Sequence, residues 1–171
     1  MRLMLLLLVL MSPVYAADYT RQEGAYTVPN VKVVRNDLKA VNLKSELSDK
    51  PVVLTFIYTT CKAICPMLTG TLKGIQAKLG DIHLVSITLD PEYDKPQKLQ
   101  DYATQIGANS NWNFYQASMA DTIMIEKAFG AYKGDKMNHT NTIYIHAPNK
   151  PWVRLDGFMT SSDVINEYQK L

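Results

Sequence analysis

The sequence predicts an α/β fold, with one domain built on a central mixed β-sheet that is covered by helices on both faces. Apolar, β-rich segments alternate along the chain with segments whose apolar residues recur at a helical period, and this order is typical of such sheets. The chain has 171 residues, of which 47% are hydrophobic and 20% are charged, as in an ordinary globular domain. No internal repeat, low-complexity tract or long linker divides it, so we expect a single domain.

The first core elements show the alternation clearly. Residues 52–58 are β-rich and nearly all apolar, as a buried parallel strand should be. Residues 66–79 carry leucines and an isoleucine at a helical period, and we expect Gly80 to close this helix. The next helix is opened by Pro96 and ended by Gly107, residues that favour those two positions.

The remaining elements complete the sheet and its cover. Ser161 or Ser162 can cap the last helix, because a serine hydroxyl accepts hydrogen bonds from the free N–H groups of a first turn. In chain order, the predicted elements are an N-terminal hairpin at 31–34 and 40–43, a strand at 52–58, a helix at 66–79, a strand at 82–89, a helix at 96–106, a strand at 112–116, a helix at 120–131, a hairpin at 142–146 and 152–155, and a helix at 163–171.

Residues 1–16 have the pattern of a secretory signal peptide, with an early arginine, an apolar run, and small residues before a cleavage point after Ala16 or Ala17. The apolar run is about half the ~20 residues that a membrane-spanning helix needs, so we expect no stable membrane anchor. We expect export, most simply to a bacterial periplasm, with residues 17–30 as a flexible lead-in and residues 31–171 as the folded domain. The net charge of +2, without a basic cluster, predicts no nucleic-acid partner.

The only two cysteines, Cys61 and Cys65, lie where the strand at 52–58 gives way to the following helix, and Pro66 comes immediately after them. One helical turn brings such residues onto one face, and the start of a helix favours thiolates. Two converging thiolates make either a redox couple or a clamp for a soft metal. A purely structural disulfide is disfavoured, because so short a loop constrains the unfolded chain little.

A cysteine pair at this junction gives the predicted architecture a thioredoxin-like arrangement. Thioredoxin-type enzymes use Cys-x-x-Cys, whereas this chain has three residues between Cys61 and Cys65. The wider spacing still permits a disulfide, and it leaves room for a metal between the sulfurs. Thiolates select Cu(I) or Zn(II) over hard ions.

His139 is the candidate third ligand. It lies in a polar loop that leads into the strand at 142–146, and in this fold that loop faces the cysteine turn. His83 and His146 lie inside predicted strands, where we expect ordinary sheet residues. A plain thiol–disulfide reductase has no need of His139, so this residue discriminates between the two uses of the cysteines.

Four further side chains lie near these candidates in the sequence. Asp90 follows a strand at the edge where α/β sheets place their sites, and it either shapes a turn or orients a ligand and tunes the thiolates. Asp94 is expected to cap the helix that Pro96 opens. Met67 and Met137 are soft transient-ligand candidates, although a methionine on a helix face is more often a core residue.

Three separated motifs occur in one order: TFIYTTCKAICP at 55–66, VSITLDPEYDKP at 85–96, and His139 with Thr140 before a strand. Together they resemble the Sco (SenC/PrrC) family, from about Val31 to the C-terminus. The resemblance implies a thioredoxin-like fold that binds one copper ion, as Cu(I) or Cu(II), through Cys61, Cys65 and His139. It also implies a role in assembling the binuclear copper centre of cytochrome c oxidase, by delivering copper, by reducing the target's cysteines, or both.

Two functions therefore remain open. In the first, the protein is a periplasmic copper chaperone whose partners are a copper-receiving cytochrome c oxidase subunit and a thiol reductant. In the second, it is an enzyme, a thiol–disulfide reductase in which one of Cys61 and Cys65 attacks a target disulfide and the other resolves it. A peroxiredoxin-like peroxidase is disfavoured, because no arginine lies between Arg35 and Arg154.

Overall fold

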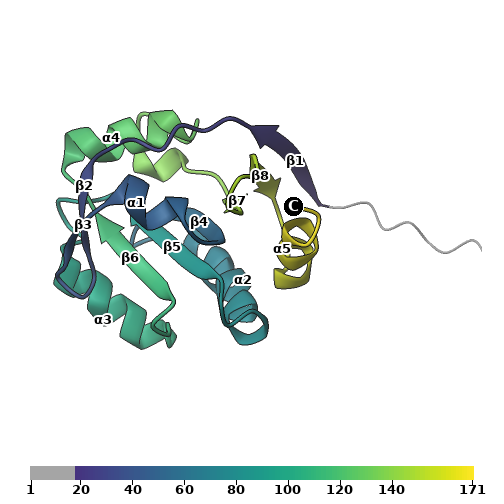
Figure 1. The fold of residues 1–171 in the computed structure, drawn as a ribbon. Coiled ribbons are helices and arrows are strands. Elements are labelled where there is room, and N and C mark those ends of the chain that lie inside the picture. The colour runs from purple at the N-terminus through teal and green to yellow at the C-terminus, as the bar shows by residue number, and fades with distance from the viewer. Residues whose placement is uncertain (1–17) are drawn as a thin grey trace, which may run out of the picture.

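An eight-stranded sheet runs through the centre of the molecule, as Figure 1 shows. The computed structural model describes residues 18–171, so the predicted signal peptide at 1–16 lies outside the described residues. In chain order the elements are β1 (Tyr19–Gly24), β2 (Lys32–Arg35), β3 (Ala40–Asn42), α1 (Leu43–Ser48), β4 (Val52–Ile57), α2 (Ile64–Lys78), β5 (His83–Thr88), α3 (Pro96–Ile106), β6 (Trp112–Gln116), α4 (Met119–Ala128), the short 3-10 helix η1 (Lys136–Asn138), β7 (Thr142–His146), β8 (Trp152–Gly157) and α5 (Ser161–Tyr168).

The strands lie in the order β1-β8-β7-β4-β5-β6-β2-β3. β4 pairs in parallel with β5, and β5 in parallel with β6, whereas the other pairs are antiparallel. The sheet is therefore mixed, with helices on both of its faces, and the predicted α/β class is confirmed. The N-terminal hairpin, β2 and β3, extends the sheet beyond β6.

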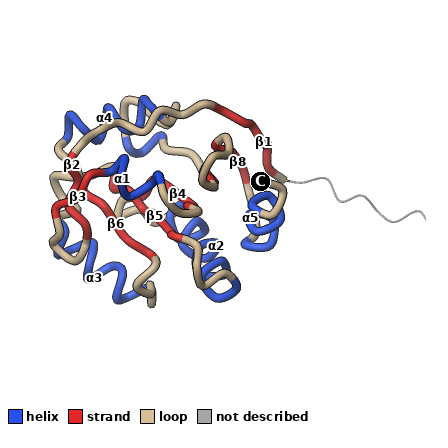
Figure 2. Tube along the Cα trace, in the orientation of Figure 1, coloured by secondary structure: helices blue, strands red, loops and turns tan. Residues whose placement is uncertain are grey.

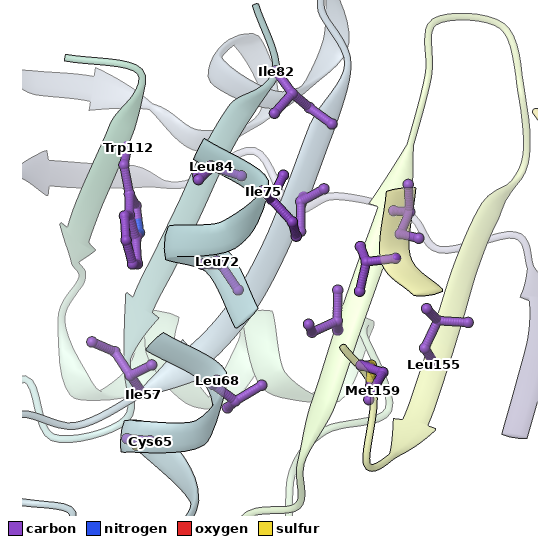
Figure 3. Packing of buried hydrophobic residues seen from close by; sticks show 14 of the residues in the cluster. Ile57, Cys65, Leu68, Leu72, Ile75, Ile82, Leu84, Trp112, Leu155 and Met159 are labelled. Carbon is purple, nitrogen blue, oxygen red and sulfur yellow. The ribbon is translucent and has the colours of Figure 1, made fainter. Parts of the chain in front are cut away.

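Two hydrophobic cores lie on opposite faces of the sheet, because alternate residues of each strand point to opposite sides. Val53 and Ile57 of β4 pack with α2, α3 and α5, whereas Leu54 and Phe56 pack with α1 and α4. In Figure 2 the blue helices accordingly lie on both sides of the red strands. Figure 3 shows the first core close up, with Leu68, Leu72 and Ile75 of α2 directed onto the sheet. The three are spaced at the helical period that predicted this helix.

The pairing of β4 with β7 places the candidate site. Because these strands are antiparallel, the end of β4 and the start of β7 lie at the same edge of the sheet, where Thr55 pairs with Ile143. The cysteine loop follows β4, and His139 precedes β7. Residues far apart in the sequence are thus brought to one edge by the sheet itself.

Residues 17–30 were expected to be a flexible lead-in. This prediction is wrong for residues 19–24, which form a strand. Tyr19–Gly24 forms the edge strand β1, which pairs along its whole length with β8. Glu167 of α5 holds β1 from one side, accepting hydrogen bonds from Tyr19 Oη at 3.0 Å and Arg21 Nε at 2.8 Å. The segment is polar because it lies on an edge, and its order comes from partners far away in the sequence.

Several helix ends also differ from the predictions. Thr160 caps α5 in place of Ser161 or Ser162, and it forms a reciprocal capping box with Asp163. Gly107 ends α3 in the left-handed region, with φ of 72°, as expected. α2 instead ends at Lys78, before Gly80. Among residues 18–171, none of the helices has both the length and the apolar character needed to cross a lipid bilayer.

Candidate metal centre

Cys61 lies in the loop after β4, and Cys65 lies in the first turn of α2. The helix begins at Ile64, two residues earlier than predicted, and its N-cap residue, Ala63, makes no capping hydrogen bond to the first N–H groups. One of them, Cys65 N–H, donates to Cys61 Sγ at 3.4 Å. Pro66 is the third helical residue, within the first turn whose N–H groups lack helical partners, so proline is tolerated there.

His139 follows η1 and is held by the backbone of that turn. Its Nδ1 donates to the Lys136 carbonyl oxygen at 2.9 Å, because a carbonyl can only accept. The hydrogen of the neutral ring is therefore on Nδ1, and the free lone pair is on Nε2. Nε2 lies 3.5 Å from Cys65 Sγ and 3.9 Å from Cys61 Sγ.

These donors form a compact group. One donor atom from each of Cys61, Cys65 and His139 lies within 4.8 Å of the other two. Metal–sulfur bonds of about 2.3 Å and metal–nitrogen bonds of about 2.0 Å, as zinc makes them, fit donors at such separations. Two sulfurs and one imidazole form a soft donor set, which suits copper better than calcium or magnesium. Cys65 and His139 are buried and Cys61 is partly exposed, so the group opens to the surface on its Cys61 side.

The surroundings distinguish the two thiols. Burial opposes ionisation of Cys61, but hydrogen bonds from the backbone of Cys65 and Ala63 outweigh it and lower the pKa of Cys61. Burial raises the pKa of Cys65, and the nearby charges of Cys61 and Asp94 add to this effect. Burial also lowers the pKa of His139, which keeps the imidazole neutral and its Nε2 lone pair available.

Asp94 does not cap α3, so that prediction is wrong. The N-cap residue is Lys95, and no side chain accepts a hydrogen bond there. Asp94 is fully buried and accepts hydrogen bonds from Thr59 N–H at 2.9 Å, from Thr88 Oγ1 at 2.7 Å, and from Thr59 Oγ1. It thereby fastens the start of the cysteine loop to the end of β5.

Asp90 contacts the turn that carries His139. Its carboxylate forms an ion pair with Lys136 Nζ, and Lys136 is the residue whose carbonyl fixes the His139 ring. Asp90 also belongs to the tight turn before α3, where its carbonyl accepts from Asp94 N–H at 2.8 Å. In the structure Asp90 thus contacts the turn before His139, and none of its hydrogen bonds reaches Cys61 or Cys65.

The other candidates lie in different settings. His83 is buried beside Asn113 and Tyr115, and His146 stacks on Trp152 at the far end of β7; neither joins the Cys61, Cys65 and His139 group. Met67 is exposed and lines a hollow of about 470 Å³ beside His139. Met137 lies in η1, and its sulfur accepts from the Tyr58 hydroxyl at 3.2 Å.

Sequence reasoning missed Tyr58, Thr59 and Lys136. Tyr58 packs edge-on against the His139 ring, with ring centroids 5.2 Å apart. Burial raises the pKa of Tyr58 to about 12, and the neighbouring Cys61 sulfur adds to this effect. A tyrosine at the end of an apolar strand is typical of a core residue, so the sequence pattern did not indicate that Tyr58 contacts the site. For Lys136, only its position three residues before His139 indicated that it could contact the site.

Comparison with known proteins points to one family. The SCO1/SenC family model matches residues 22–170. The SCO1 protein homolog of Bacillus subtilis (strain 168) is 29% identical over 136 residues, which cover 72% of this chain and 70% of that protein.

Solved structures share the fold. The structure of BsSco, described as a member of the Sco family of cytochrome c oxidase assembly proteins, is 26% identical with a TM-score of 0.71, and the match covers 84% of this chain and 92% of that one. Yeast Sco1 with copper bound is 16% identical with a TM-score of 0.71, covering 86% of this chain and 92% of the yeast chain. The fold is thus the thioredoxin-like one expected, and the chain belongs to the SCO1/SenC family.

Proposed function

We propose that this protein is an exported copper chaperone that holds one copper ion with Cys61, Cys65 and His139. Its role is to assist assembly of a copper site, that of cytochrome c oxidase. The observation that carries the proposal is the convergence of two thiols and one imidazole Nε2 within 4.8 Å. Membership of the SCO1/SenC family supports it, as does the copper held by yeast Sco1.

The local structure prepares each donor for a soft ion. The Nδ1–H of His139 is committed to the Lys136 carbonyl, so the ring needs neither rotation nor loss of a proton to present Nε2. Cys61 ionises readily, whereas Cys65 must release a proton from a buried site. Copper supplies the positive charge that makes that release favourable, so binding should liberate protons. The partly exposed Cys61 is the donor that a recipient protein can reach first.

Copper binding by the reduced protein tests this proposal. One copper per chain is expected, and Cys61→Ser or Cys65→Ser should each abolish tight binding, because a single thiolate cannot chelate. His146→Ala is the matched control, since His146 is a partly buried histidine outside the group. Protein oxidised to a Cys61–Cys65 disulfide should also lose the tight site. Unchanged copper retention in the serine variants or in the oxidised protein would refute the proposal.

A second function is favoured by the unequal exposure of the thiols. Cys61 is partly exposed and Cys65 is buried, as in a pair with one attacking and one resolving sulfur. The Cys61 thiolate would attack a target disulfide and form a mixed disulfide, releasing one target thiolate. Cys65, releasing its proton to water, would then attack Cys61. This step forms the Cys61–Cys65 disulfide, releases the second target thiolate, and moves two electrons to the target.

The two functions separate in a His139→Ala variant. Copper binding should fall sharply, because a ligand is lost. The reduction potential of the Cys61–Cys65 couple should change little, since imidazole is not part of that couple. Equal effects on both quantities, or no effect on copper, would favour the reductase.

A further inference from the structure

The Met137 sulfur occupies a fixed position beside the Cys61, Cys65 and His139 group. Met137 is 67% exposed as a residue, and an exposed methionine is ordinarily free to change rotamer. Here the Tyr58 hydroxyl donates to its sulfur at 3.2 Å. The turn beneath it is also held, because Asp135 caps η1 and accepts from Met137 N–H at 2.8 Å.

Tyr58 connects this sulfur to the candidate ligands. Its ring lies edge-on to the His139 ring, with centroids 5.2 Å apart, and its carbonyl accepts from Cys61 N–H at 3.1 Å. Tyr58 itself is only 5% exposed, so its position is fixed by packing. The exposed thioether of Met137 is thus linked through Tyr58 to both His139 and Cys61, at the outer side of the group.

We propose that Met137 is a transient Cu(I) ligand, which takes the ion at the rim while it passes to or from Cys61, Cys65 and His139. This inference rests on the proposed copper function and deepens it. A thioether is a soft ligand that suits Cu(I), and it carries no proton to be lost.

The exchange is a ligand substitution in which no electrons move. Cu(I) from a donor forms a bond to Met137 Sδ, and the hydrogen bond from Tyr58 to that sulfur breaks. The Cys61 and Cys65 thiols then bind the ion and release their protons to water. As they bind, the bond to Met137 breaks and the Tyr58 hydroxyl returns to the sulfur. Release of copper follows the same steps in reverse.

The test uses the reduced, full exported protein and measures the rate of Cu(I) transfer to bathocuproine disulfonate without oxygen. Met137→Leu keeps the shape and removes the sulfur, and it should slow the transfer roughly tenfold, the lower end of the effects seen when groups around a metal are removed. The rate of Cu(II) release should stay unchanged, because a thioether selects Cu(I). Met124→Leu, a 50% exposed methionine on α4, should leave both rates unchanged.

A double-mutant cycle separates Met137 from its neighbour. Tyr58→Phe should alter the Cu(I) rate more where Met137 is present than where it is absent, because the hydroxyl also faces the Cys61 sulfur. An equal effect of Tyr58→Phe in the Met137→Leu background would place its whole action on Cys61 or the His139 ring and overturn the proposal. Equal Cu(I) rates in Met137→Leu and the unmodified protein would also overturn it, as would equal slowing for Cu(I) and Cu(II). Copper retention that does not depend on Cys61 and Cys65 would refute the proposed function itself. Retention that does depend on them, with a rate unaffected by Met137→Leu, would refute only the role of Met137.

Discussion

The buried Asp94 carboxylate connects the cysteine loop to the end of β5 through hydrogen bonds. Its removal should lower the free energy of unfolding by an amount that these hydrogen bonds allow us to calculate. In an Asp94→Ala variant, Thr59 N–H, Thr59 Oγ1 and Thr88 Oγ1 lose their acceptor. A buried donor left without a partner costs about 1–3 kcal/mol. The Thr88 hydroxyl still accepts from Asp90 N–H at 3.0 Å, but its own hydrogen loses its acceptor. Thr88 is buried, so this loss should cost about 2 kcal/mol, whereas Thr59 is only partly buried and each of its two donors should cost about 1 kcal/mol. We therefore expect the free energy of unfolding to fall by about 4 kcal/mol.

Urea unfolding followed by tryptophan fluorescence measures this change. With a slope of about 2 kcal/mol per molar urea, the midpoint should move down by about 2 M. Asp94→Asn keeps one acceptor oxygen and should show roughly half the loss. Asp101→Ala is the matched control, because that carboxylate is exposed on α3 and meets only Gln97. A loss of about 0.5 kcal/mol or less for Asp94→Ala, the range of a surface substitution, would refute the reasoning.

Three further outcomes are expected from other parts of the fold. Burial lowers the pKa of His83 to about 4, so the unfolded chain binds the proton first and the free energy of unfolding should fall by about 3 kcal/mol between pH ~6.5 and ~4. His83→Gln should remove that part of the slope in urea titrations, and an unchanged slope would contradict the assignment. Glu167→Ala removes the partner of Arg21 and should speed amide hydrogen exchange in β1 more than in β4; equal changes would show that β1 is held otherwise. Gly157→Ala should lower the melting temperature by several degrees, because φ is +124° and a Cβ would lie 2.5 Å from the Asp18 carbonyl oxygen; an unchanged melting temperature would argue against this close approach.

The central elements could be predicted because their signals are local. The apolar run of β4 and the helical period of Leu68, Leu72 and Ile75 depend only on neighbouring residues, and both elements occur where expected. His139 could be placed opposite the cysteines because the order of strands fixes which loops share an edge. These parts follow from pattern and topology alone.

The errors concern polar residues whose partners lie far away in the sequence. The position of Asp94 two residues before Pro96 predicts a helix cap. Its actual partners are Thr59, in the loop after β4, and Thr88, at the end of β5. β1 is polar in sequence, and only its pairing with β8 makes it a strand. The link from Tyr58 to Met137 joins residues 79 positions apart. Side-chain hydrogen bonds of this kind follow from the finished packing, which no local pattern encodes.

The three donors differ in how far apart they lie along the chain. Cys61 and Cys65 are four residues apart, whereas Cys65 and His139 are separated by 74. Closing so long a loop is entropically unfavourable until β4 and β7 pair. An unfolded chain therefore carries the two sulfurs as a local chelate, and the nitrogen joins them only when the sheet is complete. A soft ion that binds during folding would therefore first be held by the two sulfurs. Its coordination by the imidazole would occur only once the polypeptide had reached its native topology.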